Sequence, residues 1–186
     1  MCKEDEDIEN FLHNRAIEFE KISKARTYLI VDADELMAED SKFVICGYIS
    51  LALKILTISE HESNRIRKKL DGFNAKMHGI PIQEFPVYLI GQLARDSRYT
   101  NSDLSGSELL QCAIDVIASA VSAVGGRYAM IECHNEPKLI SFYEHNGFKT
   151  LTKARYFIVS NILYVLQKNA VYCCAFSTFD VYYMYG

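Results

Sequence analysis

Residues 85–110 read FPVYLIGQLARDSRYTNSDLSGSELL, and this stretch decides the fold. Its first part, residues 85–95, is rich in apolar and aromatic side chains and predicts a strand. Residues 96–105 are polar and predict a loop. Residues 108–124 carry apolar side chains at helical spacing and predict a long helix. The stretch is therefore a strand, a polar loop and a helix start in direct succession.

The start of this helix has the composition of an anion-binding turn. A helix N-terminus has unpaired N–H groups and the positive end of the helix dipole. Gly106 allows a phosphate to approach the backbone closely, so the junction suits a diphosphate. Ser105, Gly106 and Ser107 also suit a simple helix cap, and the sequence leaves both interpretations open.

The flanking sequence extends this unit in both directions. Gly47 lies in an apolar segment and allows either a bulge or close packing there. The polar residues 34–42 predict a turn before that segment. Asn135 is the expected N-cap of the last helix. The order of elements predicts one α/β domain with a mixed sheet. The expected helices cover residues 8–22, 63–71, 108–124 and 137–145, and the expected strands cover residues 27–32, 43–56, 85–95, 127–133, 148–151 and 162–167.

Composition excludes several classes of protein. The 186 residues are 49% hydrophobic and 24% charged, as in globular domains, with a formal net charge of −4. The six cysteines show no CxxC spacing, the N-terminus is acidic, and the apolar run at 43–53 is too short to span a bilayer. We therefore expect a cytoplasmic protein with no membrane partner and no metal, for which nucleic-acid binding is disfavoured by the acidic balance.

Two segments carry a family resemblance. LARDSRYTNSDLSGSELL (93–110) and NEPKLISFYEHNGFK (135–149) resemble motifs of the GNAT superfamily of acetyl-CoA-dependent N-acetyltransferases. The resemblance is close over residues 85–152. It implies a single GNAT-like domain with a mixed, mostly antiparallel central sheet that splays at a V-shaped cofactor cleft, with helices on both faces.

The resemblance also implies site residues. The end of the strand at 93–95 pairs with the pantetheine arm of acetyl-CoA or CoA, and the loop at 101–107 holds the pyrophosphate through backbone N–H groups. Tyr143 matches the tyrosine that protonates the departing thiolate. The implied cofactor-binding residues are Leu93, Ala94, Arg95, Asn101, Leu104, Ser105, Gly106, Ser107 and Asn135.

The chemistry agrees with these roles. A phenol keeps its proton at neutral pH and can donate it to a thiolate. The thioester is already activated, so neither a metal nor a covalent intermediate is required. Leu104 stands where the family's phosphate loop has its first glycine. Glu84 and Glu132 are possible general bases, although a structural or solvated role is the stronger interpretation for each.

Three functional hypotheses follow. The first is direct acetyl transfer from acetyl-CoA to a primary amine of a small molecule or protein. The second is a toxin-type acetyltransferase acting on aminoacyl-tRNA, suggested by the basic cluster at 65–69. The third is a non-catalytic GNAT-fold binding module. We expect the domain to cover residues 1–168, and the aromatic extension at 169–186 to pack on it or on a partner subunit of a homodimer.

Overall fold

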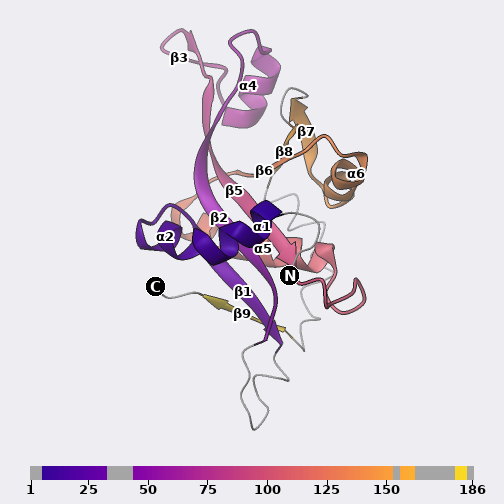
Figure 1. The fold of residues 1–186 in the computed structure, drawn as a ribbon. Coiled ribbons are helices and arrows are strands. Elements are labelled where there is room, and N and C mark those ends of the chain that lie inside the picture. Colours follow the sequence, from indigo (N-terminus) through magenta and orange to yellow (C-terminus); the bar gives the residue numbers. More distant parts are fainter. Residues whose placement is uncertain (1–5, 33–43, 153–155, 162–178, 184–186) are drawn as a thin grey trace.

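A computed structural model describes residues 6–32, 44–152, 156–161 and 179–183. Figure 1 shows an elongated α/β domain built around one twisted sheet. The helices are α1 (Glu6–Asn14), α2 (Ala16–Lys21), α4 (Asn64–Asp71), α5 (Gly106–Val124) and α6 (Pro137–His145). The strands are β1 (Arg26–Asp32), β2 (Ile45–Thr57), β3 (Lys76–Met77), β4 (Ile80–Pro81), β5 (Glu84–Arg95), β6 (Tyr128–Cys133), β7 (Lys149–Thr152), β8 (Tyr156–Asn161) and β9 (Phe179–Tyr183).

The central sheet is mixed, as expected. Its seven strands lie in the order β7-β8-β6-β5-β2-β1-β9, while β3 and β4 form a separate hairpin. The pairing of β5 with β6 is parallel, and the other pairings are antiparallel. α5 connects the parallel pair, which is the crossover that parallel neighbours require. The predicted α/β class is therefore confirmed.

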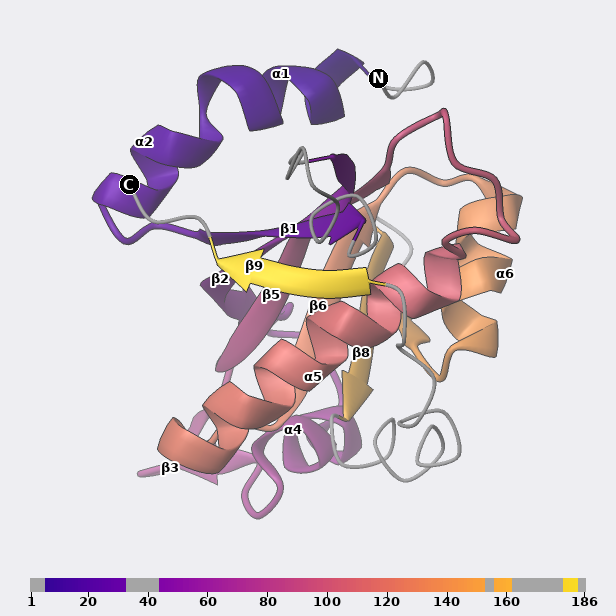
Figure 2. The same ribbon diagram turned by 90° about the horizontal axis from the view of Figure 1, so that it is seen from below.

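Helices cover both faces of the sheet. Figure 2 shows α1 and α2 on one side of β1 and β9, and α5 on the other. Tyr48 points towards α1, where its hydroxyl donates to the Ile8 carbonyl oxygen at 2.6 Å. The neighbouring Gly47 faces α5, and a Cβ there would lie 2.7 Å from the Ala94 carbonyl oxygen and 3.2 Å from Leu109. Gly47 therefore permits close packing of β2 against β5 and α5, and close packing is one of the two roles that the sequence predicts for it.

The N-terminal helical segment is broken, so the prediction of one helix over 8–22 is wrong in detail. Arg15 leaves the helical conformation, with φ −127° and ψ −27°, and separates α1 from α2. Ala16 and Glu20 of α2 are buried. The Glu20 carboxylate accepts hydrogen bonds from the Thr27 N–H at 2.7 Å and from Arg26 Nη1 at 2.6 Å. Contacts with β1 thus help to orient α2, which also packs on α1 through the edge-to-face rings of Phe11 and Phe19.

α4 forms as the sequence predicts. The Ser63 side chain caps its start, and Gly72, with φ +91°, ends it in the left-handed conformation. Leu70 packs on Phe85 and other apolar residues at the far end of the sheet. Arg67 is 1% exposed, and its guanidinium donates to the carbonyl oxygens of Ser59, Glu60 and Ile82. These bonds fix the segments on either side of α4.

α5 is the central core helix. Seven of its residues are buried against β2, β5 and β6. Among the described residues it is also the one helix long and apolar enough to cross a membrane, a criterion that core helices of soluble proteins meet as well. Burial of one face accounts for its apolar composition.

The C-terminal part differs from expectation. The predicted strand at 162–167 and the predicted turn at 34–42 lie outside the described residues. Tyr156–Asn161 forms β8, which the sequence analysis did not predict. Within the aromatic extension, Phe179–Tyr183 forms β9 and pairs with β1 in the same sheet.

Candidate active site

An opening between β5 and β6 defines the candidate site. The two strands pair only from Tyr88↔Ala129 to Ile90↔Ile131. On its other side, β5 stays paired with β2 as far as Arg95. The end of β5 at 92–95 therefore has no pairing with β6. Leu93, Ala94 and Arg95, which the resemblance implies as cofactor-binding residues, lie at this end of β5, whose backbone groups on that side are available to an extended ligand.

The loop that follows leaves selected N–H groups free. The Leu104 N–H donates to the Thr100 carbonyl oxygen at 3.1 Å, and the Ser105 N–H donates to Glu108 Oε2 at 2.6 Å. Within the described part of the chain, the N–H groups of Asn101, Gly106 and Ser107 have no hydrogen-bond partner. The structure thus leaves three of the five predicted phosphate-loop residues with an available donor.

Arg95 and Leu104 hold the loop in shape. Arg95 Nη1 donates to the Leu104 carbonyl oxygen at 2.5 Å and to Asn101 Oδ1 at 3.2 Å. The Leu104 side chain is 0% exposed and packs in the main core cluster with Leu109. The leucine that replaces glycine in the family pattern therefore anchors the loop. The Leu104 N–H could bind a phosphate only if its hydrogen bond to the Thr100 carbonyl oxygen were broken.

Tyr143 lies on α6, beside the same helix start. Its ring packs edge-to-face on Phe142 and Phe148, with centroids at 5.0 and 6.0 Å. Phe142 in turn covers Gly106, where a Cβ would lie 3.3 Å from its ring. The contact of the Phe142 ring with the start of α5 therefore places α6, which carries Tyr143, next to the loop that contains the free N–H groups.

The Tyr143 hydroxyl is available for chemistry. No hydrogen bond to it is formed by the described residues. In that part of the chain, Thr27 Oγ1 is the one fully buried polar side-chain atom that has no hydrogen-bond partner. The Tyr143 oxygen also has no partner but does not belong to this class, so it retains contact with solvent. Burial of the ring, and secondarily the charge of Cys133, raise the pKa of Tyr143 to about 12. The phenol therefore keeps its proton at neutral pH.

Asn135 does not cap α6, contrary to the prediction. Glu136 occupies the N-cap position without a side-chain hydrogen bond, and Pro137 begins the helix. Asn135 is exposed in the turn between β6 and α6. Because β5 and β6 are parallel, their carboxyl ends lie at the same edge of the sheet, so Asn135 and Arg95 flank the same opening.

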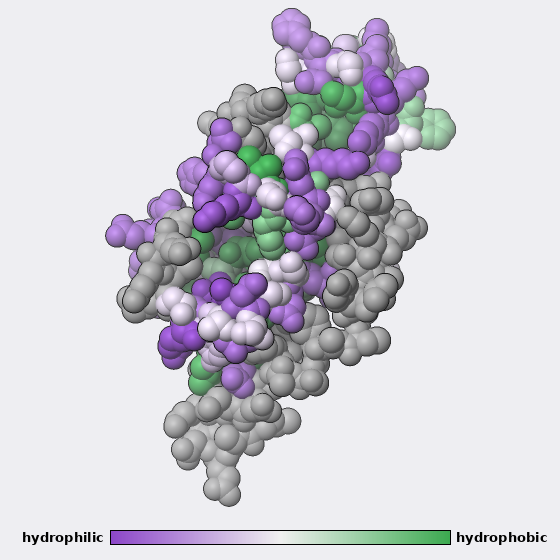
Figure 3. All heavy atoms as spheres, turned by 90° about the vertical axis from the view of Figure 1, so that its right-hand side faces the viewer, coloured by the Kyte–Doolittle hydropathy of each residue, from purple (hydrophilic) through white to green (hydrophobic). Residues whose placement is uncertain are grey.

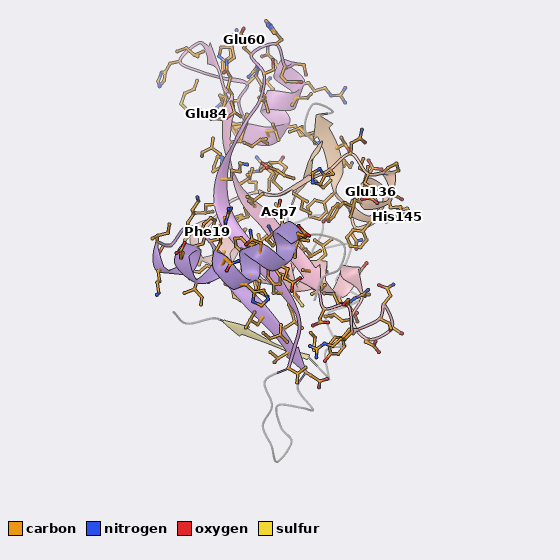
Figure 4. The ribbon with its side chains drawn as sticks, viewed as in Figure 1. Asp7, Phe19, Glu60, Glu84, Glu136 and His145 are labelled. Atoms are coloured by element: carbon orange, nitrogen blue, oxygen red, sulfur yellow. The ribbon has the colours of Figure 1, made fainter. Side chains whose placement is uncertain are left out.

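The two possible general bases occupy different places. Glu84 is exposed at the start of β5, about 36 Å along the strand from Arg95. Figure 4 shows it towards the upper end of the molecule, away from Glu136 and His145 of α6. Glu132 lies on β6 beyond the paired segment and forms an ion pair with Lys54. Of the two possible general bases, Glu132 is therefore the one near the opening.

A cavity of about 390 Å³ borders the end of β5 on the α1 side. Apolar side chains of α1 and β2, among them Ile8 and Leu12, line it together with Arg95, Asp96 and Arg98. Arg98 donates to the Asp96 carboxylate at 2.9 Å and holds the pKa of Asp96 well below its usual range. The lining includes Ala94 and Arg95 but neither Tyr143 nor Gly106. Arg95 therefore borders both this cavity and the phosphate loop.

One feature of the site was missed in the sequence. Ser105 and Glu108 form a capping box, in which each side chain accepts from the other's backbone N–H. The spacing Ser-x-x-Glu before an apolar helix is the signal that predicts it. Glu108 thus belongs to the site although no role was assigned to it.

Comparisons with known proteins identify the fold. No family model and no curated protein matches the sequence. Solved structures do match. AtaTR bound with AcCoA has a TM-score of 0.68 and 21% identity, covering 90% of this chain and 87% of that one. AtaT complexed with acetyl-methionyl-tRNAfMet has a TM-score of 0.66 and 20% identity, covering 90% and 88%.

A third structure is a tyrosine-to-phenylalanine mutant of KacT, with a TM-score of 0.69, 21% identity and coverage of 90% and 88%. AtaT and KacT are toxin acetyltransferases of the GNAT family. The present chain therefore has the GNAT fold, and the resemblance stated from its sequence is confirmed at that level.

Proposed function

We propose that the chain is an acetyl-CoA-dependent N-acetyltransferase whose acceptor is the amino group of an aminoacyl-tRNA. The observation that carries the enzymatic part is the opening between β5 and β6, with free N–H groups at one side and with Tyr143 next to Phe142, whose ring covers Gly106. Of the acceptors predicted from the sequence, charged tRNA gains support because a structural neighbour was solved with acetyl-methionyl-tRNAfMet. Such an acceptor places the reaction in the cytoplasm.

The residues present fit the donor. The unpaired edge of β5 at 92–95 matches the amides of a pantetheine arm, and the N–H groups of Asn101, Gly106 and Ser107 match a diphosphate. Acetyl-CoA supplies an activated acetyl group. The acceptor amine forms a bond to the acetyl carbon as the carbon–sulfur bond breaks and the amine loses a proton. Tyr143 gives its phenolic proton to the leaving sulfur and regains one from solvent.

A transfer assay tests the proposal. The purified chain is incubated with radiolabelled acetyl-CoA and with charged or uncharged tRNA. We expect the radioactive acetyl group to appear on the charged tRNA alone. Hydrolysis of the ester bond between the amino acid and the tRNA should then release the label from the RNA. Acetylation of small amines without labelling of tRNA would overturn the acceptor but keep the enzyme.

A non-catalytic binding module is the second candidate. It is favoured by the Ser105 N–H, which is already engaged by Glu108. Absence of CoA binding in calorimetry, at concentrations up to 1 mM or roughly −4 kcal/mol of binding free energy, would select it over the enzyme.

The solvent face of α4 supports an RNA acceptor. Arg65, Lys68 and Lys69 are exposed, and none of them forms an ion pair with another described residue. Figure 3 shows hydrophilic side chains around a smaller hydrophobic area in the upper part of the molecule, where α4 lies. Unpaired cations of this kind bind phosphates through counterion release. A folded RNA is large enough to contact both α4 and the distant opening.

Charge reversal on α4 is therefore expected to weaken the reaction with tRNA. The variant R65E/K68E/K69E should raise the KM for charged tRNA about tenfold or more, and should reduce the salt dependence of binding. The KM for acetyl-CoA should not change. The matched control R15E/K21E/K24E makes the same change in net charge on α1 and α2 and their flanks, where the three side chains are also exposed. Equal effects of the two variants would show that α4 has no specific role.

A further inference from the structure

We propose that Glu108 determines the specificity of the donor site by competing with the diphosphate of the donor for the start of α5. The inference rests on the proposed function, because it assumes that acetyl-CoA binds at this helix start. The Glu108 carboxylate takes a position at the start of α5 that an anionic ligand would otherwise use. Affinity for a donor that contains a diphosphate then depends on displacing Glu108.

The hydrogen bonds of the capping box define the competition. Glu108 Oε2 accepts from the Ser105 N–H at 2.6 Å, while the Glu108 N–H donates to Ser105 Oγ at 3.2 Å. The neighbouring N–H groups of Gly106 and Ser107 remain free within the described residues. A diphosphate seated on these two groups would therefore lie next to a carboxylate of the same sign.

Electrostatics make the two anions exclusive. The dipole and the unpaired N–H groups of one helix start stabilise a single adjacent negative charge well. Glu108 already supplies that charge. A bound diphosphate would meet repulsion from it, and it would also lack the Ser105 donor until the carboxylate moved away.

Only one side chain has to move. Arg95 holds the loop through the Leu104 carbonyl oxygen and Asn101 Oδ1, and the buried Leu104 side chain anchors it from below. Glu108 itself is exposed. A change of its rotamer therefore frees the Ser105 N–H without rebuilding the loop. This makes Glu108, rather than the backbone, the element that sets donor affinity.

Two substitutions separate its effects. Glu108→Ala removes both the charge and the capping bond, so the Kd for CoA should fall about three- to tenfold and the Tm by a few degrees. Glu108→Gln removes the charge but keeps a side chain able to cap, so the Kd for CoA should fall with a smaller change in Tm. The combination of higher affinity and lower stability distinguishes competition from a purely structural role.

The test measures CoA binding by calorimetry in the full chain, with Asp115→Ala as the control. Asp115 lies on the same helix about 10 Å further along, so its loss makes the same charge change away from the loop. In a steady-state assay, the Glu108 variants should gain kcat/KM for acetyl-CoA but not for S-acetylpantetheine, which has no diphosphate.

The outcomes distinguish the two proposals. Tighter CoA binding by both Glu108 variants and unchanged binding by Asp115→Ala would support the role of Glu108. Equal or weaker CoA binding by the Glu108 variants would overturn it and leave the proposed function in place. Absence of CoA binding by the wild-type chain and by both variants would overturn both.

Discussion

Tyr143→Phe is expected to lower kcat for acetyl transfer about 100- to 1,000-fold while leaving CoA binding and folding nearly unchanged. The substitution removes only the hydroxyl, which makes no hydrogen bond with the described residues. The ring keeps its contacts with Phe142 and Phe148. The leaving sulfur then departs without its proton donor, so the loss falls on kcat rather than on the KM for acetyl-CoA.

Tyr128→Phe provides the matched control. Tyr128 is also a buried tyrosine, but its hydroxyl donates to the Lys69 carbonyl oxygen at 2.6 Å. Its loss should lower the Tm and leave kcat unchanged, which is the reverse of the pattern expected for Tyr143→Phe. Full activity of Tyr143→Phe would contradict the assignment of Tyr143 as the proton donor.

The pH profile gives a further readout of the same prediction. Burial raises the pKa of Tyr143 to about 12, so the phenol stays protonated throughout the neutral and mildly alkaline range. Activity should therefore show no loss attributable to Tyr143 below about pH 11. An alkaline decline near pH 9 would have to come from another group.

Arg67→Ala is expected to lower the free energy of unfolding by about 3 kcal/mol or more. The guanidinium is nearly inaccessible and donates to three carbonyl oxygens, those of Ser59, Glu60 and Ile82. Its removal leaves these three acceptors without a protein donor and opens a void beneath α4. Urea denaturation measures the change.

Arg65→Ala is the control for this substitution. Arg65 lies on the same helix but is exposed and unpaired among the described residues, so its loss should change stability by less than about 0.5 kcal/mol. A similar small effect of Arg67→Ala would show that water satisfies the three carbonyl groups and that Arg67 is dispensable for the fold.

Local signals in the sequence predicted much of the fold. Ser63 and Gly72 set the ends of α4 through capping, which depends on a few neighbouring residues. The break at Arg15 was not predictable in this way, because it depends on how Glu20 bonds to β1. The sequence from 156 to 166 holds two apolar stretches separated by Ser160 and Asn161, and the strand was assigned to the second of them, so β8 was missed.

In the candidate site, too, local sequence predicted some features, while others depend on tertiary contacts. The loop, the helix start and the position of Tyr143 followed from motifs. Which N–H groups stay free did not, because the Thr100 turn, Arg95 and Glu108 decide it through contacts that form only in the folded loop. The opening between β5 and β6 was implied by the resemblance, and its extent depended on strand register.

The pairing of β1 with β9 has a consequence for biosynthesis. Tyr28 of β1 lies in register with Tyr183 of β9, so the first strand to leave the ribosome must wait for a partner that is made more than 150 residues later. At ordinary elongation rates this interval is roughly ten to thirty seconds. Throughout that time the outer edge of β1 offers unsatisfied backbone groups to other nascent chains. Chaperones that shield exposed strands would therefore act on this protein while it is still being synthesised.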